Sequence, residues 1–180
     1  MKEISNFLIA LKEYRFQIFK SHVNYVLENY LEKWVIDAGN STSNFDPDSI
    51  CLIIEDRANS LTRFSILNTL FMTKLRMKIH LYTSKNCFDK MKNLFSDISQ
   101  FVNIIQLNIN NSDLINIDIP IYNSIFKSSS FWESIPSKKI LVFQTDSLLI
   151  EPLDFSMLQY DYVGAPFVKG RHRSIQFPDF

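Results

Sequence analysis

Two polar clusters in this 180-residue sequence follow apolar segments, and both contain residue types that bind phosphate or metal. Glu55–Arg57 (Glu-Asp-Arg) stands at the end of the apolar run Ile50–Glu55, and Gln144–Ser147 (Gln-Thr-Asp-Ser) ends the run Lys138–Gln144. An arginine guanidinium donates paired hydrogen bonds to phosphate, and hard cations such as Mg²⁺ or Mn²⁺ prefer carboxylate oxygen. The chemistry that these residues predict is binding of a phosphorylated ligand, with a dication offsetting its charge.

Each cluster also has an ordinary structural explanation. Glu55–Arg57 is suited to a local ion pair beside a helix N-terminus, and an aspartate such as Asp146 commonly caps a helix or closes a turn. In the functional interpretation Arg57 binds phosphate, a carboxylate accepts from a base or ribose, and Asp146 binds the metal. The residue types alone leave both interpretations open.

The segments around these clusters alternate between strand and helix patterns. Strands are predicted at Ile50–Glu55, Lys78–Ser84, Val102–Asn108 and Lys138–Gln144, with a short fifth at Tyr160–Phe167, and helices at Asn59–Leu75, Phe88–Ile98 and Ile121–Ile135. Apolar strands separated by helices predict a three-layer α/β fold of Rossmann-like type with a mostly parallel sheet. Ligands bind beyond the carboxyl ends of such strands. The candidate binding residues there are Glu55, Arg57, Ser84, Gln144, Thr145, Asp146 and Ser147.

The N-terminal segment has a different pattern. From Ile4 to Val35 apolar residues recur at helical spacing, which predicts one long amphipathic helix or two shorter ones. Packing on its own domain is the ordinary use of such a face, and docking on a partner protein is the alternative. The polar stretch Asp37–Ser49 predicts a boundary between a helical segment with its linker, residues 1–45, and a ligand-binding domain, residues 46–180.

Composition excludes several classes of protein. Nineteen basic residues balance nineteen acidic ones, so no electrostatic reason exists to expect nucleic acid or an anionic membrane as a partner. No apolar run reaches the roughly 18 residues of a membrane span, and no signal peptide is evident, so a cytoplasmic location is expected. With glycine only at Gly39, Gly164 and Gly170, the chain contains no P-loop or dinucleotide fingerprint.

Cysteine and histidine indicate no metal centre. Cys51 and Cys87 each lie in an apolar context, which predicts small buried side chains. The three histidines have no metal-type spacing, and the basic cluster Lys169–Arg173 is expected to be a solvated loop rather than a phosphate clamp.

Three blocks of rarer residues resemble a known family. Phe131–Glu133 (Phe-Trp-Glu), Phe143–Ser147 (Phe-Gln-Thr-Asp-Ser) and Tyr160–Pro166 (Tyr-Asp-Tyr-Val-Gly-Ala-Pro) stand in the order typical of the DUF5672 family. The resemblance extends over about Ile50 to Phe167. Family members look like GT-A-type glycosyltransferases, in which a nucleotide-sugar lies over the carboxyl ends of the first strands.

The resemblance implies a function and a metal ligand. It implies transfer of a sugar from a UDP- or GDP-linked donor to an acceptor that the sequence does not name. In GT-A enzymes an Asp-x-Asp motif meets the metal and the ribose, and here Gln144–Asp146 retains one aspartate, so Asp146 is the expected Mn²⁺ or Mg²⁺ ligand. No catalytic base is identified.

The same resemblance implies an alternative function. Family members continue into a Gly-rich segment that this sequence lacks, which implies a short member of the family. The alternative function is therefore a catalytically degenerate domain that binds a nucleotide-sugar or serves as a scaffold. A phosphatase of the haloacid dehalogenase type is not favoured, because the first strand is not followed by Asp-x-Asp.

Overall fold

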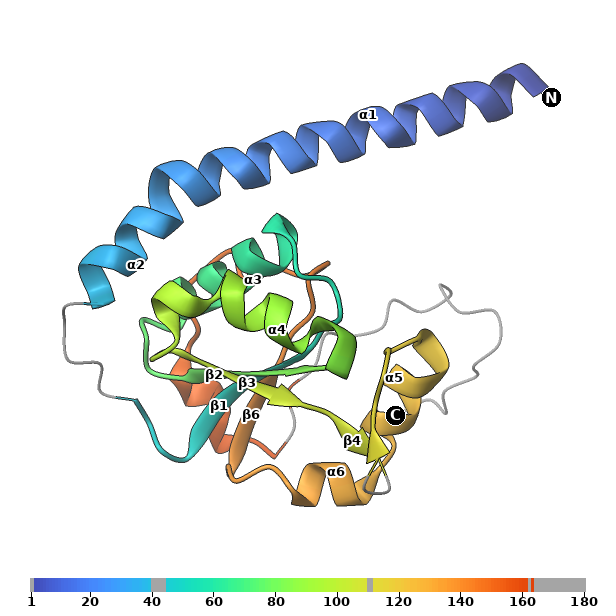
Figure 1. Ribbon diagram of the computed structural model, residues 1–180. Coiled ribbons are helices and arrows are strands. Elements are labelled where there is room, and N and C mark those ends of the chain that lie inside the picture. The colour runs from blue at the N-terminus through green and yellow to red at the C-terminus, as the bar shows by residue number, and fades with distance from the viewer. Residues whose placement is uncertain (1, 40–44, 110–111, 162, 164–180) are drawn as a thin grey trace, which may run out of the picture.

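A computed structural model describes residues 2–39, 45–109, 112–161 and 163, and shows an α/β fold (Figure 1). Its central sheet has four parallel strands in the order β3-β2-β1-β6. These strands are β1 (Ser49–Ile54), β2 (Lys78–Thr83), β3 (Val102–Gln106) and β6 (Lys139–Val142). The prediction of a parallel sheet is confirmed. Because β1 lies between β2 and β6, the polar segments that follow β1 and β6 emerge side by side.

Helices cover both faces of the sheet. Helices α3 (Ser60–Met72) and α4 (Lys85–Leu94) lie on one face, and α5 (Ile119–Phe126) and α6 (Ser129–Glu133) pack on the other (Figure 1). Strand β1 is buried on both sides: Cys51 and Ile53 join the core under α3 and α4, while Leu52 and Ile54 join the core with Ile125 of α5. Burial of both faces is the physical reason for the unbroken apolar run.

Short elements complete the described fold. They are the 3₁₀ turns η2 (Ser96–Ile98) and η3 (Phe155–Gln159), and the antiparallel pair β4 (Asn108–Ile109) and β5 (Ser112–Asp113). None of the described helices is long and apolar enough to cross a membrane. Cys51 and Cys87 are both buried and free, as the sequence predicted.

The N-terminal segment is helical throughout its described length. It consists of α1 (Lys2–Val26), a π-helical turn η1 (Leu27–Leu31) and α2 (Glu32–Gly39). Its buried positions, Val23, Leu27, Leu31 and Val35, are four residues apart and face α3. Trp34 packs edge-on against Phe71 of α3, with ring centroids 5.0 Å apart. The predicted packing on the domain therefore involves the second half of the segment, while residues 9–22 are exposed and α1 extends past the body of the fold (Figure 1).

Two sequence predictions differ from the structure or lie outside it. The single helix predicted at Ile121–Ile135 is wrong, because α5 and α6 are separate helices and the Ser128 hydroxyl caps α6 by accepting the N–H of Phe131. The predicted fifth strand lies outside the described residues except for Tyr160, Asp161 and Val163, which are not in a strand. The basic cluster at residues 169–173 also lies outside them.

Candidate functional site

A cavity of about 430 Å³ opens at the carboxyl ends of β1 and β6. Three segments form its walls: residues 54–57 after β1, residues 117–122 around the start of α5, and residues 144–146 after β6, with Leu61 of α3. The volume falls in the range of roughly 300–1,000 Å³ that is usual for small-molecule sites. The charged lining side chains are four carboxylates against one guanidinium, which makes the cavity acidic: Glu55, Asp56, Asp118 and Asp146 against Arg57.

The Glu55 carboxylate organises the loop after β1. It is only 7% exposed. Its Oε1 accepts hydrogen bonds from the backbone N–H groups of Asp56 and Arg57 and from Arg57 Nε, at 2.8–2.9 Å. Its Oε2 accepts from Arg57 Nη2 at 2.7 Å and from Thr145 Oγ1 at 3.1 Å. These five bonds occupy the lone pairs of the carboxylate, so Glu55 positions its neighbours.

Arg57 is held at the mouth of the cavity. Its side chain is 65% exposed. Besides its paired bonds to Glu55, Nη2 donates to Thr145 Oγ1 at 2.9 Å. The hydrogen bonds to Glu55 raise the pKa of Arg57 against the opposing effect of desolvation, and the negative charges of Glu55 and Asp146 add to the increase. Nη1 has no hydrogen-bond partner among the described residues, so this edge of the guanidinium remains open for an anion.

Thr145 joins the two loops. It is 4% exposed, and its hydroxyl lies between Glu55 and Arg57, donating to one and accepting from the other. Ser65 of α3 donates to the Thr145 carbonyl at 3.4 Å, which also fixes the backbone. Thr145 therefore connects the end of β6 to the end of β1.

We expect Thr145→Val to lower the free energy of unfolding by about 1–2 kcal/mol, because valine keeps the shape but removes two hydrogen bonds, one of them to the buried Glu55 carboxylate. Urea denaturation measures the change. Ser129→Ala, an exposed hydroxyl with no side-chain hydrogen bond among the described residues, is the matched control and should stay within about 0.5 kcal/mol. Equal stability of Thr145→Val and wild type would show that the bridge contributes nothing.

The turn after β6 is closed by Ser147. The Ser147 hydroxyl accepts from the backbone N–H of Gln144 at 3.2 Å and donates to its carbonyl at 3.0 Å. In contrast, the exposed Asp146 carboxylate accepts no hydrogen bond from any residue that the structure describes. The structural role that an aspartate often has at a strand end belongs here to its neighbour, so the Asp146 oxygens are free to bind a ligand.

Helix α5 contributes residues that the sequence analysis did not single out. The Tyr122 hydroxyl contacts Gln144 Nε2 by a short hydrogen bond. Burial raises the pKa of Tyr122, and the negative charges of Asp146 and Glu55 raise it further, although the bond to Gln144 lowers it. Asp118 caps α5 by accepting the N–H of Ile121 at 2.9 Å. The Asp-x-Pro pattern signals that cap, but nothing in the helical periodicity separates Tyr122 from a core residue.

Asp56 connects three segments beneath the cavity. Its Oδ1 accepts from the backbone N–H of Ser84 at 3.0 Å and from Thr83 Oγ1 at 3.1 Å. Its Oδ2 accepts from the N–H of Ile117 at 3.1 Å. The end of β1 is therefore tied to the end of β2 and to the segment that enters α5.

The structure brings together five of the seven predicted binding residues. Glu55, Arg57, Gln144, Thr145 and Asp146 line the cavity, whereas Ser84 and Ser147 do not. Ser84 is fully buried, and its hydroxyl has no hydrogen-bond partner within the described part of the chain. Contact of any of these residues with a nucleotide stays a prediction.

The described residues include no group of three or more histidine, cysteine or acidic side chains placed to hold a metal ion. The donor set suits a cation that takes one carboxylate from the protein and its remaining oxygens from a ligand and water, as Mg²⁺ commonly does. Among the described residues that line the cavity, Asp146 has a carboxylate free for that role.

A family model matches part of the chain. No curated protein and no solved structure matches the chain. Residues 105–178 match the model of DUF5672, described as a protein of unknown function. The matched segment contains α5, α6, β6 and the cavity walls around Tyr122 and Asp146, whereas Glu55–Arg57 precede it. The match shows likeness to the DUF5672 family over residues 105–178, which is less than half of the chain.

Proposed function

We propose that the protein is a GT-A-type glycosyltransferase that takes its sugar from a UDP- or GDP-linked donor. One observation carries the proposal: Arg57, after β1, and Asp146, after β6, line the same cavity at the carboxyl ends of neighbouring parallel strands. That edge is where open parallel sheets bind ligands. Asp146, which lies in the segment matched by the family model, therefore lines the same cavity as Arg57, the residue suited to phosphate.

The charge of the cavity indicates that the donor binds with a cation. With four carboxylates and one guanidinium, the cavity would repel a bare diphosphate. Asp146 would hold Mn²⁺ or Mg²⁺, and the open edge of Arg57 would donate to a phosphate oxygen. Leu61, Ile119 and Tyr122 supply an apolar wall suited to a base. The bound cation supplies charge stabilisation for the departing nucleoside diphosphate.

A second candidate is a domain that binds the nucleotide-sugar without transferring it. Three of the four carboxylates that line the cavity are engaged by hydrogen bonds inside the protein: Glu55, Asp56 and Asp118. Within the described residues of the cavity, Asp146 is then the one carboxylate without such a bond, and it is needed for the cation. A deprotonating base for the acceptor is not evident in this lining, which favours binding over catalysis.

The decisive variant is Asp146→Asn, which preserves the shape and removes the charge that a hard cation requires. Isothermal titration with UDP and with GDP, each with and without Mn²⁺, should show that Mn²⁺ strengthens binding to wild type by about tenfold or more and leaves the variant unchanged. Asp89→Asn, an exposed carboxylate on α4 outside the cavity, should behave as wild type.

The outcomes separate the candidates. If Mn²⁺ strengthens binding equally in wild type and Asp146→Asn, Asp146 is not the metal ligand. Incubation of wild type with a panel of nucleotide-sugars then distinguishes the functions: transfer or hydrolysis identifies the enzyme, and binding without turnover identifies the binding domain. Absence of both binding and turnover would contradict both candidates.

A further inference from the structure

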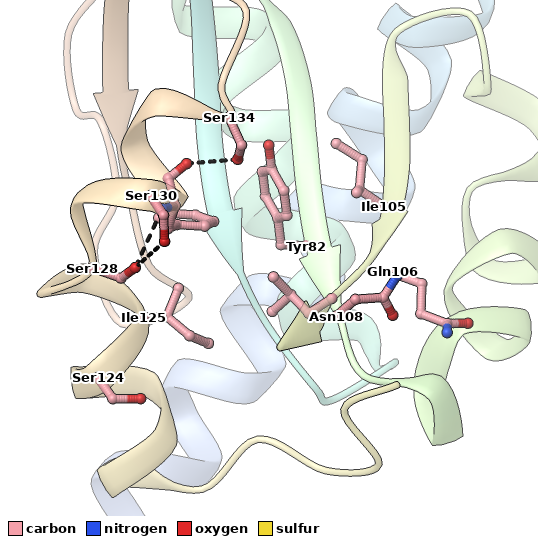
Figure 2. Close-up of a pocket in the computed structure, with 11 residues that line it drawn as sticks. Tyr82, Ile105, Gln106, Asn108, Ser124, Ile125, Ser128, Ser130 and Ser134 are labelled. Carbon is pink, nitrogen blue, oxygen red and sulfur yellow. Dashed lines mark hydrogen bonds between the residues drawn. The ribbon is translucent and has the colours of Figure 1, made fainter. Parts of the chain in front are cut away.

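A second cavity, also of about 430 Å³, lies between the ends of β2 and β3 and the helices α5 and α6 (Figure 2). It shares no lining residue with the acidic cavity, although α5 contributes to both: Ser124 and Ile125 here, Ile119 and Tyr122 there. An inference about it therefore stands independently of the proposed function.

The lining of this second cavity carries no charge. Every described residue that lines it is neutral. The carboxylate that contacts the lining residue Gln106 is already engaged, because Asp113 accepts from Gln106 Nε2 and pairs with Lys85 Nζ, both at 2.7 Å. Transferring an ion from water into such a cavity has a large cost without a counter-charge. A ligand of this cavity is thus uncharged.

Four serine hydroxyls line one side of the cavity (Figure 2). Ser124 donates its proton to the Ile121 carbonyl and Ser134 donates to the Phe131 carbonyl, both at 2.7 Å. Their remaining lone pairs can accept hydrogen bonds from a ligand. Ser128 and Ser130 share one hydrogen bond of 2.8 Å, which leaves one proton of the pair to donate. The serine-lined side of the cavity therefore offers both hydrogen-bond acceptors and a donor. Hydroxyl groups of a ligand can bind to both, because a hydroxyl donates and accepts.

Tyr82 supplies a hydroxyl on the other side of the cavity. It stands on β2, faces the cavity opposite the serines and is only 6% exposed (Figure 2). Its hydroxyl has no hydrogen-bond partner among the described residues, and burial raises its pKa, so it stays a neutral donor. The Tyr82 side chain is mostly buried, but its hydroxyl is not among the described polar atoms that are enclosed without a partner, so the hydroxyl is accessible and can donate to a ligand oxygen.

The remaining surface is apolar and aromatic. The rings of Tyr82 and Phe131 pack edge to face with centroids 5.3 Å apart, and Ile105 and Ile125 extend this surface. A ligand that fits has hydroxyl groups on its edges and an apolar C–H face that packs on the rings. We infer that this cavity binds the ring of an uncharged sugar, through the Tyr82 and serine hydroxyls and the Phe131 ring.

The test compares neutral and charged sugars of similar size, and ligand-observed NMR at millimolar sugar concentrations measures their binding. Glucose, galactose and N-acetylglucosamine should include at least one binder, and the glucuronate and sugar-phosphate counterparts of that binder should not bind, because the lining offers no counter-charge. The binder is then compared with a disaccharide that carries the same terminal ring. Tighter binding of the disaccharide would identify the end of a glycan, rather than a free sugar, as the ligand.

Two variants link binding to this cavity. Tyr82→Phe removes only the unpartnered hydroxyl, so folding should persist while affinity falls by about fivefold or more. Ser134→Ala, on the opposite wall, should also weaken binding, and Tyr160→Phe, an exposed tyrosine outside the cavity, should not. The inference is overturned if no neutral sugar binds, if charged and neutral sugars bind equally, or if Tyr82→Phe binds as wild type does.

Discussion

Replacing Glu55 by alanine is expected to lower the free energy of unfolding by about 3 kcal/mol. The variant removes five hydrogen bonds to a carboxylate that is 7% exposed, two of them from the backbone N–H groups of Asp56 and Arg57. The loss stays below the sum of five charged hydrogen bonds, because Arg57 is largely exposed and regains water. Urea denaturation followed by circular dichroism measures the change.

Two controls show where the loss arises. Glu55→Gln keeps one acceptor oxygen and should lose less than Glu55→Ala, whereas Glu151→Ala, an exposed carboxylate with no side-chain hydrogen bond among the described residues, should stay within about 0.5 kcal/mol of wild type. A double-mutant cycle with Arg57→Leu isolates the coupling of the pair. A loss below about 1 kcal/mol for Glu55→Ala would contradict a structural role for this carboxylate.

Asp56→Ala is expected to cost about 2–3 kcal/mol, because it leaves the backbone N–H groups of Ser84 and Ile117 without their shared acceptor. The effect should be local as well as global. Hydrogen exchange at the Ser84 and Ile117 amides should become faster than at β1, since the tie between the ends of β1 and β2 and the start of α5 is lost.

The isosteric variant sharpens this second prediction. Asp56→Asn retains one acceptor but directs N–H donors at a site that receives three hydrogen bonds, so it should also lose stability. Asp89→Ala, on the exposed face of α4, should remain within about 0.5 kcal/mol. Unchanged exchange at Ile117 in Asp56→Ala would show that the α5 segment is held by other contacts.

These stability effects decide how binding data are to be interpreted. Weakened nucleotide binding in a Glu55 or Asp56 variant would not show that the replaced carboxylate contacts the nucleotide, because both carboxylates hold the cavity walls in place. Asp146 is different: its carboxylate is exposed and free of hydrogen bonds from the described residues, so its replacement should change binding without changing stability. The Asp146→Asn titration therefore reports on the ligand site itself.

Periodicity in the sequence was sufficient to determine the class of fold and the positions of its polar strand ends. Runs such as Ile50–Glu55 predict parallel strands buried on both faces, because side chains of a central strand alternate between two apolar cores. The apolar spacing does not reveal the break between α5 and α6, since it continues across the break while Ser128 provides a local cap. Local capping chemistry overrode the helical period there.

Tertiary structure alone decided which strand ends meet and which side chains remain free. Strand order depends on contacts between segments far apart in the chain, so the sequence did not determine that β6 pairs with β1 and places Thr145 against Glu55. The roles of the polar residues depend on the same contacts: Glu55 and Asp56 are taken up by donors from other segments, Ser147 closes the turn, and Asp146 is left facing the cavity. Residue type states which hydrogen bonds a side chain can make, and only the surrounding fold determines which of them are already made.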